Sequence, residues 1–566
     1  MKRNRILKSF IVFTLIILLI GTQSLVFAKP SKEVVQQVEK ATYEITKSPD
    51  SKLFVNLEKK ISEAKDGDEV PVTVVFNKKL TDEEFASIEK LLGNPEIKHK
   101  FEIIPGATLS LTKEQISKLE KSDLVKQVEY DETVHATINT ASNWFGVSKA
   151  RTDFAGIDGD HDSAPVTYTK NDIVVAVIDT GIDASHVDLD GGKVIAWKDW
   201  VGNKTTPYDD NGHGTHVAAT VAGTGDGNAN YKGVAPGAAL IGLKVLDSSG
   251  GGTISNVTAA IDWAVANKDA YNIRIISLSL GTTGSSDGTD STSLAINNAF
   301  NAGIVPVVAA GNSGPRKATI GSPGAAAKAL TVAAFGDVGE KGFFLADFSS
   351  RGLTADGRLK PDISAPGYNI TSAKANSTNQ YVAYSGTSMA TPFTSGTAAL
   401  ILDANPDLTP AQVVSYITGT AQDWGSAGQD LDYGFGRLDS YEAVKAAGGF
   451  SGTGIDIPTH LYKTDSLAGT NKYDEFTITI PDTNYPIAIT LIHPNWTSSQ
   501  DFDIYLYNPS GTEVAGSESA TRQETIGYTP TAAGTYKIKV LSYKGSGSYS
   551  IDLSSGASSI TQTTNQ

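Results

Sequence analysis

The stretch "DIVVAVID" (172–179) decides the fold of the central part of the chain. It is apolar without the alternation of a strand that has one solvated face, so it predicts a strand covered on both faces of a sheet. Similar apolar runs, and helical patterns between them, recur at 238–246, 254–269, 273–280, 291–303, 304–310 and 329–334. This alternation predicts an open, mostly parallel α/β sheet with helices on both faces, spanning 137–446. Such sheets place their sites at the carboxyl ends of the strands.

Polar residues beside glycines stand at these predicted strand ends and helix starts: Asp179, His213, Asn312 and Ser388. Ser388 begins a predicted helix, where free N–H groups favour developing negative charge. A serine hydroxyl needs a base to become nucleophilic, which His213 would supply, and Asp179 would fix the tautomer of that base. Asn312, which alone would be read as a turn residue, would donate to an oxyanion. The set predicts nucleophilic acyl transfer.

Single members of this set allow plainer interpretations. Asp179 could cap a helix or bind calcium, and Asp183 and Asp188 are rival acids, although both lie past the strand. His213 and His216, at i and i+3, could form a metal pair, but a third ligand with matching spacing is missing.

Signature segments in a fixed order strengthen the catalytic interpretation. These are "VIDTGID" (177–183), "NGHGTHVAATVAG" (211–223), "AAGNSG" (309–314) and "SGTSMATP" (385–392). They resemble the motifs of the subtilisin family of secreted serine proteases, whose order is acid, histidine, serine. The resemblance, over 140–445, implies Ser388 as nucleophile, His213 as general base and acid, and Asp179 as orienting acid. It implies that the Asn312 side chain and the Ser388 N–H bind the oxyanion.

The resemblance also implies a cleft that holds an extended substrate as an added strand. The cleft residues it implies are Gly250, Gly251, Gly252, Ser279, Leu280, Gly281, Ala310, Gly311 and Gly321. Gly321 would leave the floor of the P1 pocket open and without charge. We therefore expect large apolar or aromatic P1 residues and broad tolerance elsewhere. The glycine run at 250–252 could instead be a flexible loop.

The amino-terminal part predicts two segments ahead of the catalytic region. A basic start and a short apolar run over 1–28, ending at Ala28, predict a secretory signal peptide and hence an extracellular protein. A membrane anchor is the alternative, although the apolar run is short for a span. Residues 29–136 predict a βαββαβ ferredoxin-like α+β unit. The resemblance makes it a propeptide that assists folding, inhibits the cleft and is cut between Ala136 and Ala141. A permanent regulatory domain is the alternative.

The carboxyl-terminal part predicts an all-β domain. Residues 447–454 are expected to be a linker, 455–556 a β-sandwich or jelly roll, and the polar tail 557–566 disordered. The domain resembles the β-domain that follows bacterial secreted peptidases. Asp501 and Asp503 project to one face of a predicted strand and could bind calcium, or could simply face solvent.

Composition limits the partners and the cofactors. The net charge of −15 argues against nucleic acid, and the absence of cysteine excludes disulfides and a thiol nucleophile. The resemblance implies structural calcium but no cofactor for catalysis. Asp188 matches one calcium ligand of the family, although "TGDGNANY" (224–231) lacks the usual ligand loop. Acid clusters at 158–162 and 209–210 are further candidates.

The sequence thus predicts a secreted, monomeric serine endopeptidase of broad specificity, made as a self-cleaving zymogen. Its partners would be polypeptide substrates and its own propeptide, without nucleic acid, and without a membrane once the signal is removed. Two alternatives remain: a catalytically silent binding or adhesion protein on the same scaffold, and a protease dedicated to processing one partner. An acidic protein with an apolar cleft argues mildly against a processing enzyme that cuts at dibasic sites.

Overall fold

The computed structural model describes residues 51–566 except 54, 66, 96, 101–104, 131–137 and 165–166. The predicted signal peptide (1–28), the start of the predicted propeptide and Ala136 lie outside the described residues. The chain divides into two compact units, Met1–Val134 and His135–Gln566.

The first unit is an antiparallel sheet with helices. Its strands β1 (Glu69–Phe76), β2 (Ile97–Lys100), β3 (Gly106–Thr112) and β4 (Val125–Tyr130) are ordered β2-β3-β1-β4. Its helices are α3 (Val55–Glu63), α4 (Asp82–Leu92) and α5 (Lys113–Glu120). Capping boxes at Thr81 and Thr112 start α4 and α5, as expected where Thr precedes Glu or Gln by three residues. The predicted βαββαβ order is confirmed, with α3 added ahead of it.

The second unit is built on a seven-stranded sheet ordered β11-β10-β9-β8-β5-β7-β6, in which every pairing is parallel. Its strands are β5 (Val174–Asp179), β6 (Val194–Asp199), β7 (Ala239–Lys244), β8 (Ile273–Leu278), β9 (Val305–Ala309), β10 (Leu330–Phe335) and β11 (Ile363–Pro366). The strand order changes direction at β5, between β7 and β8, and this is the switch point where open α/β sheets bind ligands.

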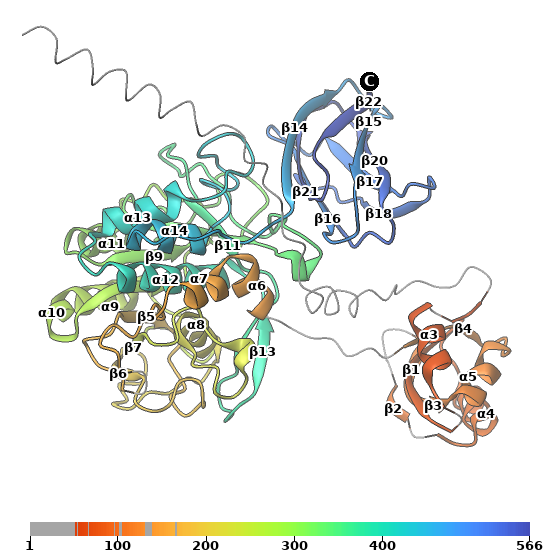
Figure 1. Ribbon diagram of the computed structural model, residues 1–566, viewed down its shortest axis with the longest axis horizontal. Helices are drawn as coiled ribbons and strands as arrows, with labels where there is room; N and C mark the ends of the chain where they lie inside the picture. The colour runs from red at the N-terminus through yellow and green to blue at the C-terminus, as the bar shows by residue number, and fades with distance from the viewer. Residues whose placement is uncertain are drawn as a thin grey trace, which may run out of the picture. The chain divides into compact units, whose positions relative to one another are not determined.

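Helices cover both faces of this sheet, as predicted (Figure 1). The apolar side chains of α9 and α11 form a core on one face, and those of α8, α12, α13 and α14 form a core on the other. The bounds are α6 (Ile138–Trp144), α7 (Val147–Asp153), α8 (His213–Ala222), η1 (Ala229–Tyr231), α9 (Ile254–Ala266), α10 (Lys268–Tyr271), α11 (Ser291–Asn301), η2 (Val338–Glu340), α12 (Thr387–Ala404), α13 (Pro410–Gly419) and α14 (Ser440–Gly448), with the hairpin β12 (Ile370–Ala373) and β13 (Tyr381–Tyr384).

The carboxyl-terminal part is a two-sheet β-domain, as predicted. The sheets are ordered β14-β21-β16-β19 and β18-β17-β20-β15-β22. The strands are β14 (Thr459–Leu467), β15 (Tyr473–Ile480), β16 (Ile487–Ile492), β17 (Asp501–Tyr507), β18 (Glu513–Ser517), β19 (Gln523–Tyr528), β20 (Gly534–Lys544), β21 (Gly547–Ser555) and β22 (Ile560–Thr564). The expectation of a disordered tail over 557–566 is wrong, because β22 pairs antiparallel with β15. Backbone hydrogen bonds hold this polar edge strand without the apolar side chains that would have signalled it.

The β-domain and the catalytic part share buried polar contacts. Arg522 donates two hydrogen bonds, of 2.6 and 2.9 Å, to the carboxylate of Asp432, and Arg351 donates to Gln523 at 2.7 Å. The segment expected to be a linker also packs, since the ring of Phe450 stacks on that of Phe154 at 4.6 Å. The β-domain is therefore fastened to the protease part through its own side chains as well as through the connecting chain.

Candidate active site

The polar residues predicted at strand ends and helix starts lie at the carboxyl edge of the sheet. Asp179 is the last residue of β5, and His213 is the first residue of α8. Ser388 is the second residue of α12, and Asn312 follows the end of β9 by three residues. The central strand and two helix starts therefore direct these side chains to the switch point of the sheet.

Asp179 and His213 form a short, charge-assisted hydrogen bond. His213 Nδ1 lies 2.7 Å from Asp179 Oδ1, and the Asp179 side chain is fully buried. Burial of His213 opposes its protonation, but the charge and the hydrogen bond of Asp179, with the charge of Asp209, outweigh it. The pKa of His213 is therefore raised above its ordinary value. The bond orients the imidazole with Nε2 left for a partner.

The loop ahead of α8 fixes His213. Gly212 adopts φ 108°, a left-handed conformation that favours glycine, and ends the loop. The carboxylate of Asp209 accepts the Gly212 N–H at 2.8 Å and the hydroxyl of Thr180 at 3.0 Å, which ties the loop to the residue after Asp179. Asn211 accepts the His213 N–H at 3.1 Å. The acid and the base are thus held by one network.

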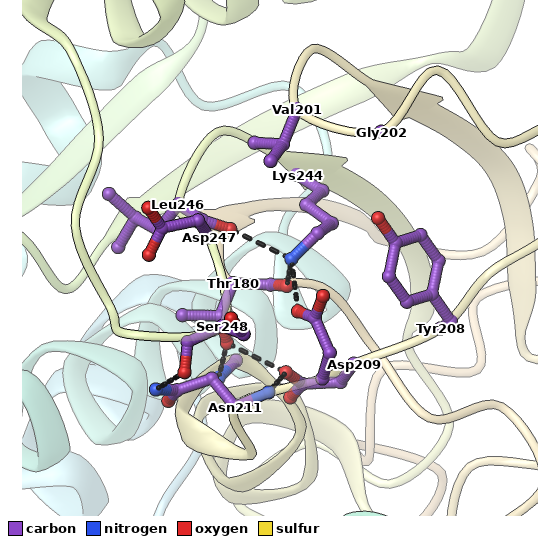
Figure 2. Close-up of polar contacts among 12 residues, drawn as sticks. Thr180, Val201, Gly202, Tyr208, Asp209, Asn211, Lys244, Leu246, Asp247 and Ser248 are labelled. Atoms are coloured by element: carbon purple, nitrogen blue, oxygen red, sulfur yellow. Dashed lines mark hydrogen bonds and ion pairs between the residues drawn. The ribbon is translucent and has the colours of Figure 1, made fainter.

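A buried lysine completes this network, and the sequence reasoning missed it. Lys244, at the end of β7, has no exposed side-chain surface and lies 2.7 Å from Asp210. Its ammonium also donates to the carbonyl oxygens of Thr180 and Leu246 (Figure 2). The signal was available, because a lysine inside the apolar run 238–246 must find buried acceptors.

Ser388 lies at the start of α12 with its hydroxyl turned to a carbonyl. Ser388 Oγ donates to the Ser279 carbonyl at 3.1 Å, and Ser279 Oγ donates to the Ser388 carbonyl at 2.8 Å. Within the described part of the chain, Ser388 and His213 share no hydrogen bond. In enzymes without substrate such bonds are often long and tighten on binding. The neighbouring Met389 is 1% exposed and packs in the core.

The amide of Asn312 is oriented by Thr387. Asn312 Oδ1 accepts both the N–H and the hydroxyl of Thr387 at 3.0 Å, so its Nδ2 is left to donate elsewhere. A Cβ added at Gly386 would lie 3.3 Å from that Nδ2. The glycine before the helix thus keeps space open beside the predicted oxyanion donor.

A groove of about 560 Å³ runs beside His213. Its lining includes the predicted cleft residues Gly250, Gly251, Gly252, Ser279, Leu280 and Gly281. Among the described residues that line it, none is Asp, Glu, Lys or Arg.

Other predicted cleft residues lie outside this lining, namely Ala310, Gly311 and Gly321. That Gly321 forms the floor of a P1 pocket stays a prediction. A Cβ there would collide with the Thr282 carbonyl, so Gly321 serves a close contact between two backbones.

His213 and His216 do not form a metal pair. His216 is fully buried and its Nε2 lies 2.9 Å from the Ile370 carbonyl oxygen. Burial lowers the pKa of His216 to about 3, and the charge of His213 adds to this effect. This histidine is neutral and anchors the β12–β13 hairpin.

The carboxylates predicted as calcium ligands differ in their surroundings. Asp188 accepts the Gly227 N–H at 2.9 Å with one oxygen and the Tyr381 hydroxyl at 3.0 Å with the other, and its role as a calcium ligand stays a prediction. Asp501 Oδ1 is buried without a partner among the described residues. Burial raises the pKa of Asp503 to about 6, with the charge of Asp501 contributing. Among the described residues, these two acids do not belong to a group of three potential ligands.

Known proteins resemble all three parts of the chain. Residues 170–436 match the Subtilase family, 49–115 match the Tk-SP N-propeptide domain, and 472–542 match the bacterial pre-peptidase C-terminal domain. Serine protease AprX of Bacillus subtilis (strain 168) is 42% identical over 300 residues, which is 49% of this chain and 67% of AprX.

Two further relatives extend the match. A thermostable alkaline protease of Halalkalibacterium halodurans is 38% identical over 334 residues, covering 58% of this chain and 81% of that protein. Subtilisin E of Bacillus subtilis (strain 168) is 34% identical over 353 residues, covering 62% of this chain and 83% of that protein.

In the described part of the chain, no helix combines the length and apolar character needed to cross a membrane.

Proposed function

The chain belongs to the subtilase family and is a serine endopeptidase with an N-terminal propeptide domain, and from this membership we propose which residues act and what they cut. The observation that carries the proposal is the 2.7 Å bond between His213 and Asp179 beside a groove whose described lining contains no Asp, Glu, Lys or Arg.

In the proposed reaction, Ser388 Oγ attacks the scissile carbonyl carbon while His213 takes its proton. His213 then gives that proton to the leaving amine, and water repeats the cycle on the acyl-enzyme. Asp179 holds the imidazole and stabilises its charged form. The side-chain amide of Asn312 and the Ser388 N–H donate to the oxyanion. Before attack, the Ser388 hydroxyl rotates from the Ser279 carbonyl toward His213.

The proposed substrates are polypeptides with large apolar P1 residues and little restriction elsewhere. Apolar side chains and glycines line the groove, among them Leu246, Ile254, Val257 and Leu280. Without a carboxylate in the lining, a basic substrate side chain placed in this groove would lose water without gaining a partner. This argues against a processing enzyme specific for dibasic sites.

We propose that the protein is secreted as a monomeric zymogen whose first domain inhibits it. The cut falls ahead of α6, because Ala141 lies inside that helix and is fully buried in the protease core. Of the predicted range from Ala136 to Ala141, the part before Ile138 is therefore the better candidate.

The test compares the intact mass of the chain without residues 1–28 with that of its Ser388→Ala variant. The proposal expects the active chain to lose a segment ending just before Ile138, while the variant stays whole. If both stay whole, the folded chains are trimmed ahead of residue 138 with an added protease, which is then removed, and are assayed on casein. Activity that disappears in Ser388→Ala supports the proposal. No activity in either chain supports a silent scaffold, and equal activity in both means that Ser388 is not the nucleophile; either result overturns the proposal.

A further inference from the structure

Carboxylates gather ahead of β5, outside the proposed catalytic machinery. One carboxylate oxygen from each of Asp160, Asp162 and Asp172 lies within 4.8 Å of the other two. Asp160 and Asp162 lie in the loop after α7, half-buried and exposed respectively. Acidic clusters at a surface are common, so this grouping alone would carry little weight.

Asp172 supplies the second observation. Asp172 is only 1% exposed, and its Oδ1 has no hydrogen-bond partner among the described residues. The other oxygen accepts the Thr169 N–H at 2.7 Å. A buried carboxylate oxygen without a hydrogen-bond donor destabilises the folded state. A bound cation would remove this cost. Burial, with the charges of Asp162 and Asp160, raises the pKa of Asp172 to about 6.

No side chain nearby supplies that cation. Within the described part of the chain, none of the three aspartates forms an ion pair. The charge of Asp172 acts on Lys193, but the two do not pair. The Lys193 ammonium instead donates to the Pro236 carbonyl at 2.5 Å and lies 3.7 Å from the centre of the Tyr168 ring. The lysine is therefore engaged elsewhere.

The three oxygens suit a hard divalent ion. Calcium binds six to eight oxygens at about 2.3–2.6 Å, so oxygens within 4.8 Å of one another can all touch one ion. The Ala164 N–H lies 3.0 Å from Oδ1 of both Asp160 and Asp162, which holds these side chains in place. Backbone carbonyls and water would complete the shell. We propose that Asp160, Asp162 and Asp172 bind one calcium ion that fastens the loop after α7 to the start of β5.

This ion would link elements that carry two proposed catalytic residues. Asp172 leads into β5, which ends at Asp179. The same loop is tied to the end of α12, the helix that begins beside Ser388, because the N–H groups of Asp158 and Gly159 donate to Asp403 at 3.0 and 2.9 Å. Removing the ion would loosen the loop between these two elements and expose it to cleavage.

The test uses the full chain carrying Ser388→Ala, so that self-digestion cannot confuse the result. Native mass spectrometry counts calcium ions after dialysis into CaCl2, and thermal unfolding is followed with CaCl2 and with chelator. Asp162→Asn alters an exposed side chain, and Asp172→Asn keeps the shape of a buried one. Both should hold one ion fewer than the parent and gain less in Tm from CaCl2. Their calcium affinity should fall by at least about 10-fold, the loss that even outer partners of a metal cause.

Asp269→Asn is the matched control, because the Asp269 side chain on α10 is 97% exposed. It should keep both the ion count and the Tm response of the parent. An unchanged ion count in Asp162→Asn and Asp172→Asn overturns the proposal. So does an Asp172→Asn variant that is stabilised in chelator while keeping every ion, since Asp172 would then be a buried acid only.

Discussion

The fully buried ammonium group of Lys244 lies 2.7 Å from Oδ1 of Asp210 and also donates to the carbonyl of Thr180, the residue that follows Asp179. Lys244 thereby joins the end of β7 to the end of β5 and to the loop before His213. Its charge is satisfied entirely by groups of this edge of the sheet. We infer that Lys244 is a positioning residue for the Asp179–His213 pair.

Replacing Lys244 with Met keeps the length of the side chain but removes its donors. We expect the free energy of unfolding to fall by about 1–3 kcal/mol, because the Thr180 and Leu246 carbonyls lose their buried partner. We also expect kcat to fall with little change in KM, since the orientation of the acid and base is disturbed. Urea unfolding in the Ser388→Ala background and peptide hydrolysis measure the two effects.

Lys360→Met is the control for that variant. Lys360 is also buried and pairs with Asp362, but it donates to the Ala329 carbonyl, just before β10 and thus at the amino edge of the sheet. It should lose stability without losing kcat. If the two variants lose stability equally and both keep kcat, the positioning role of Lys244 is refuted.

The pH dependence of activity should follow His213. A general base must be neutral, so kcat/KM rises with pH through the pKa of His213, which Asp179 helps to raise. Asp179→Asn removes the raising charge, so the acid limb of the profile should move to lower pH. The maximal rate should fall by about 10⁴-fold, the loss seen when the triad acid is removed in other serine proteases. Asp183→Asn, the rival acid, should leave the profile unchanged; an unshifted limb in Asp179→Asn would contradict the assignment.

Two variants distinguish the role of the proposed oxyanion donor, Asn312, from that of Thr387, which orients it. Asn312→Ala should lower kcat by about 10²–10³-fold, the loss caused by removing one such donor in subtilisin. Thr387→Val removes one of the two donors that orient the Asn312 amide, so it should cost about 2–10-fold in kcat. Thr391→Val is the control, because the Thr391 hydroxyl donates to the Thr387 carbonyl in the helix and to no other described residue. Equal rates for the two valine variants would argue against a role for Thr387.

The sequence predicts the sheet well because its strands are buried on both faces. The run 173–178, between Asp172 and Asp179, is apolar throughout, and all six residues of β5 are buried. Residues at strand ends could therefore be brought to one edge by topology alone, and Asp179 and His213 do meet there. Whether each predicted residue acts in catalysis stays a prediction.

What the sequence could not predict depends on contacts between distant backbones. β22 has a polar sequence and pairs with β15 through its main chain, so no apolar period marks it. Gly321 is a glycine because the Thr282 carbonyl lies against it, which no local pattern reveals. The orientation of the Ser388 hydroxyl is decided by the Ser279 carbonyl, more than a hundred residues away in the chain.

The contact between Arg522 and Asp432 should make the β-domain part of the stability of the protease. Burial opposes the ionisation of Asp432, but the charge and hydrogen bonds of Arg522 outweigh it and lower the pKa of Asp432. A lowered pKa in the folded state adds stability above the ordinary aspartate pKa of about 3.9, and this stability is lost as the pH falls through the folded-state value. Arg522→Met should therefore lower the free energy of unfolding by about 3–5 kcal/mol near neutral pH. The loss should be smaller as the pH falls toward the folded-state pKa of Asp432.

Guanidinium unfolding of Ser388→Ala chains between neutral and acidic pH measures this difference. Lys537→Met is the matched control, because Lys537 pairs with Glu475 at the surface of the β-domain, where an ion pair contributes about 0–1 kcal/mol. The Arg522–Asp432 pair is buried and joins the β-domain to the catalytic part, whereas the Lys537–Glu475 pair lies within the β-domain. The two variants could instead unfold at the same guanidinium concentration at every pH. That result would mean that the β-domain is joined to the protease without stabilising it.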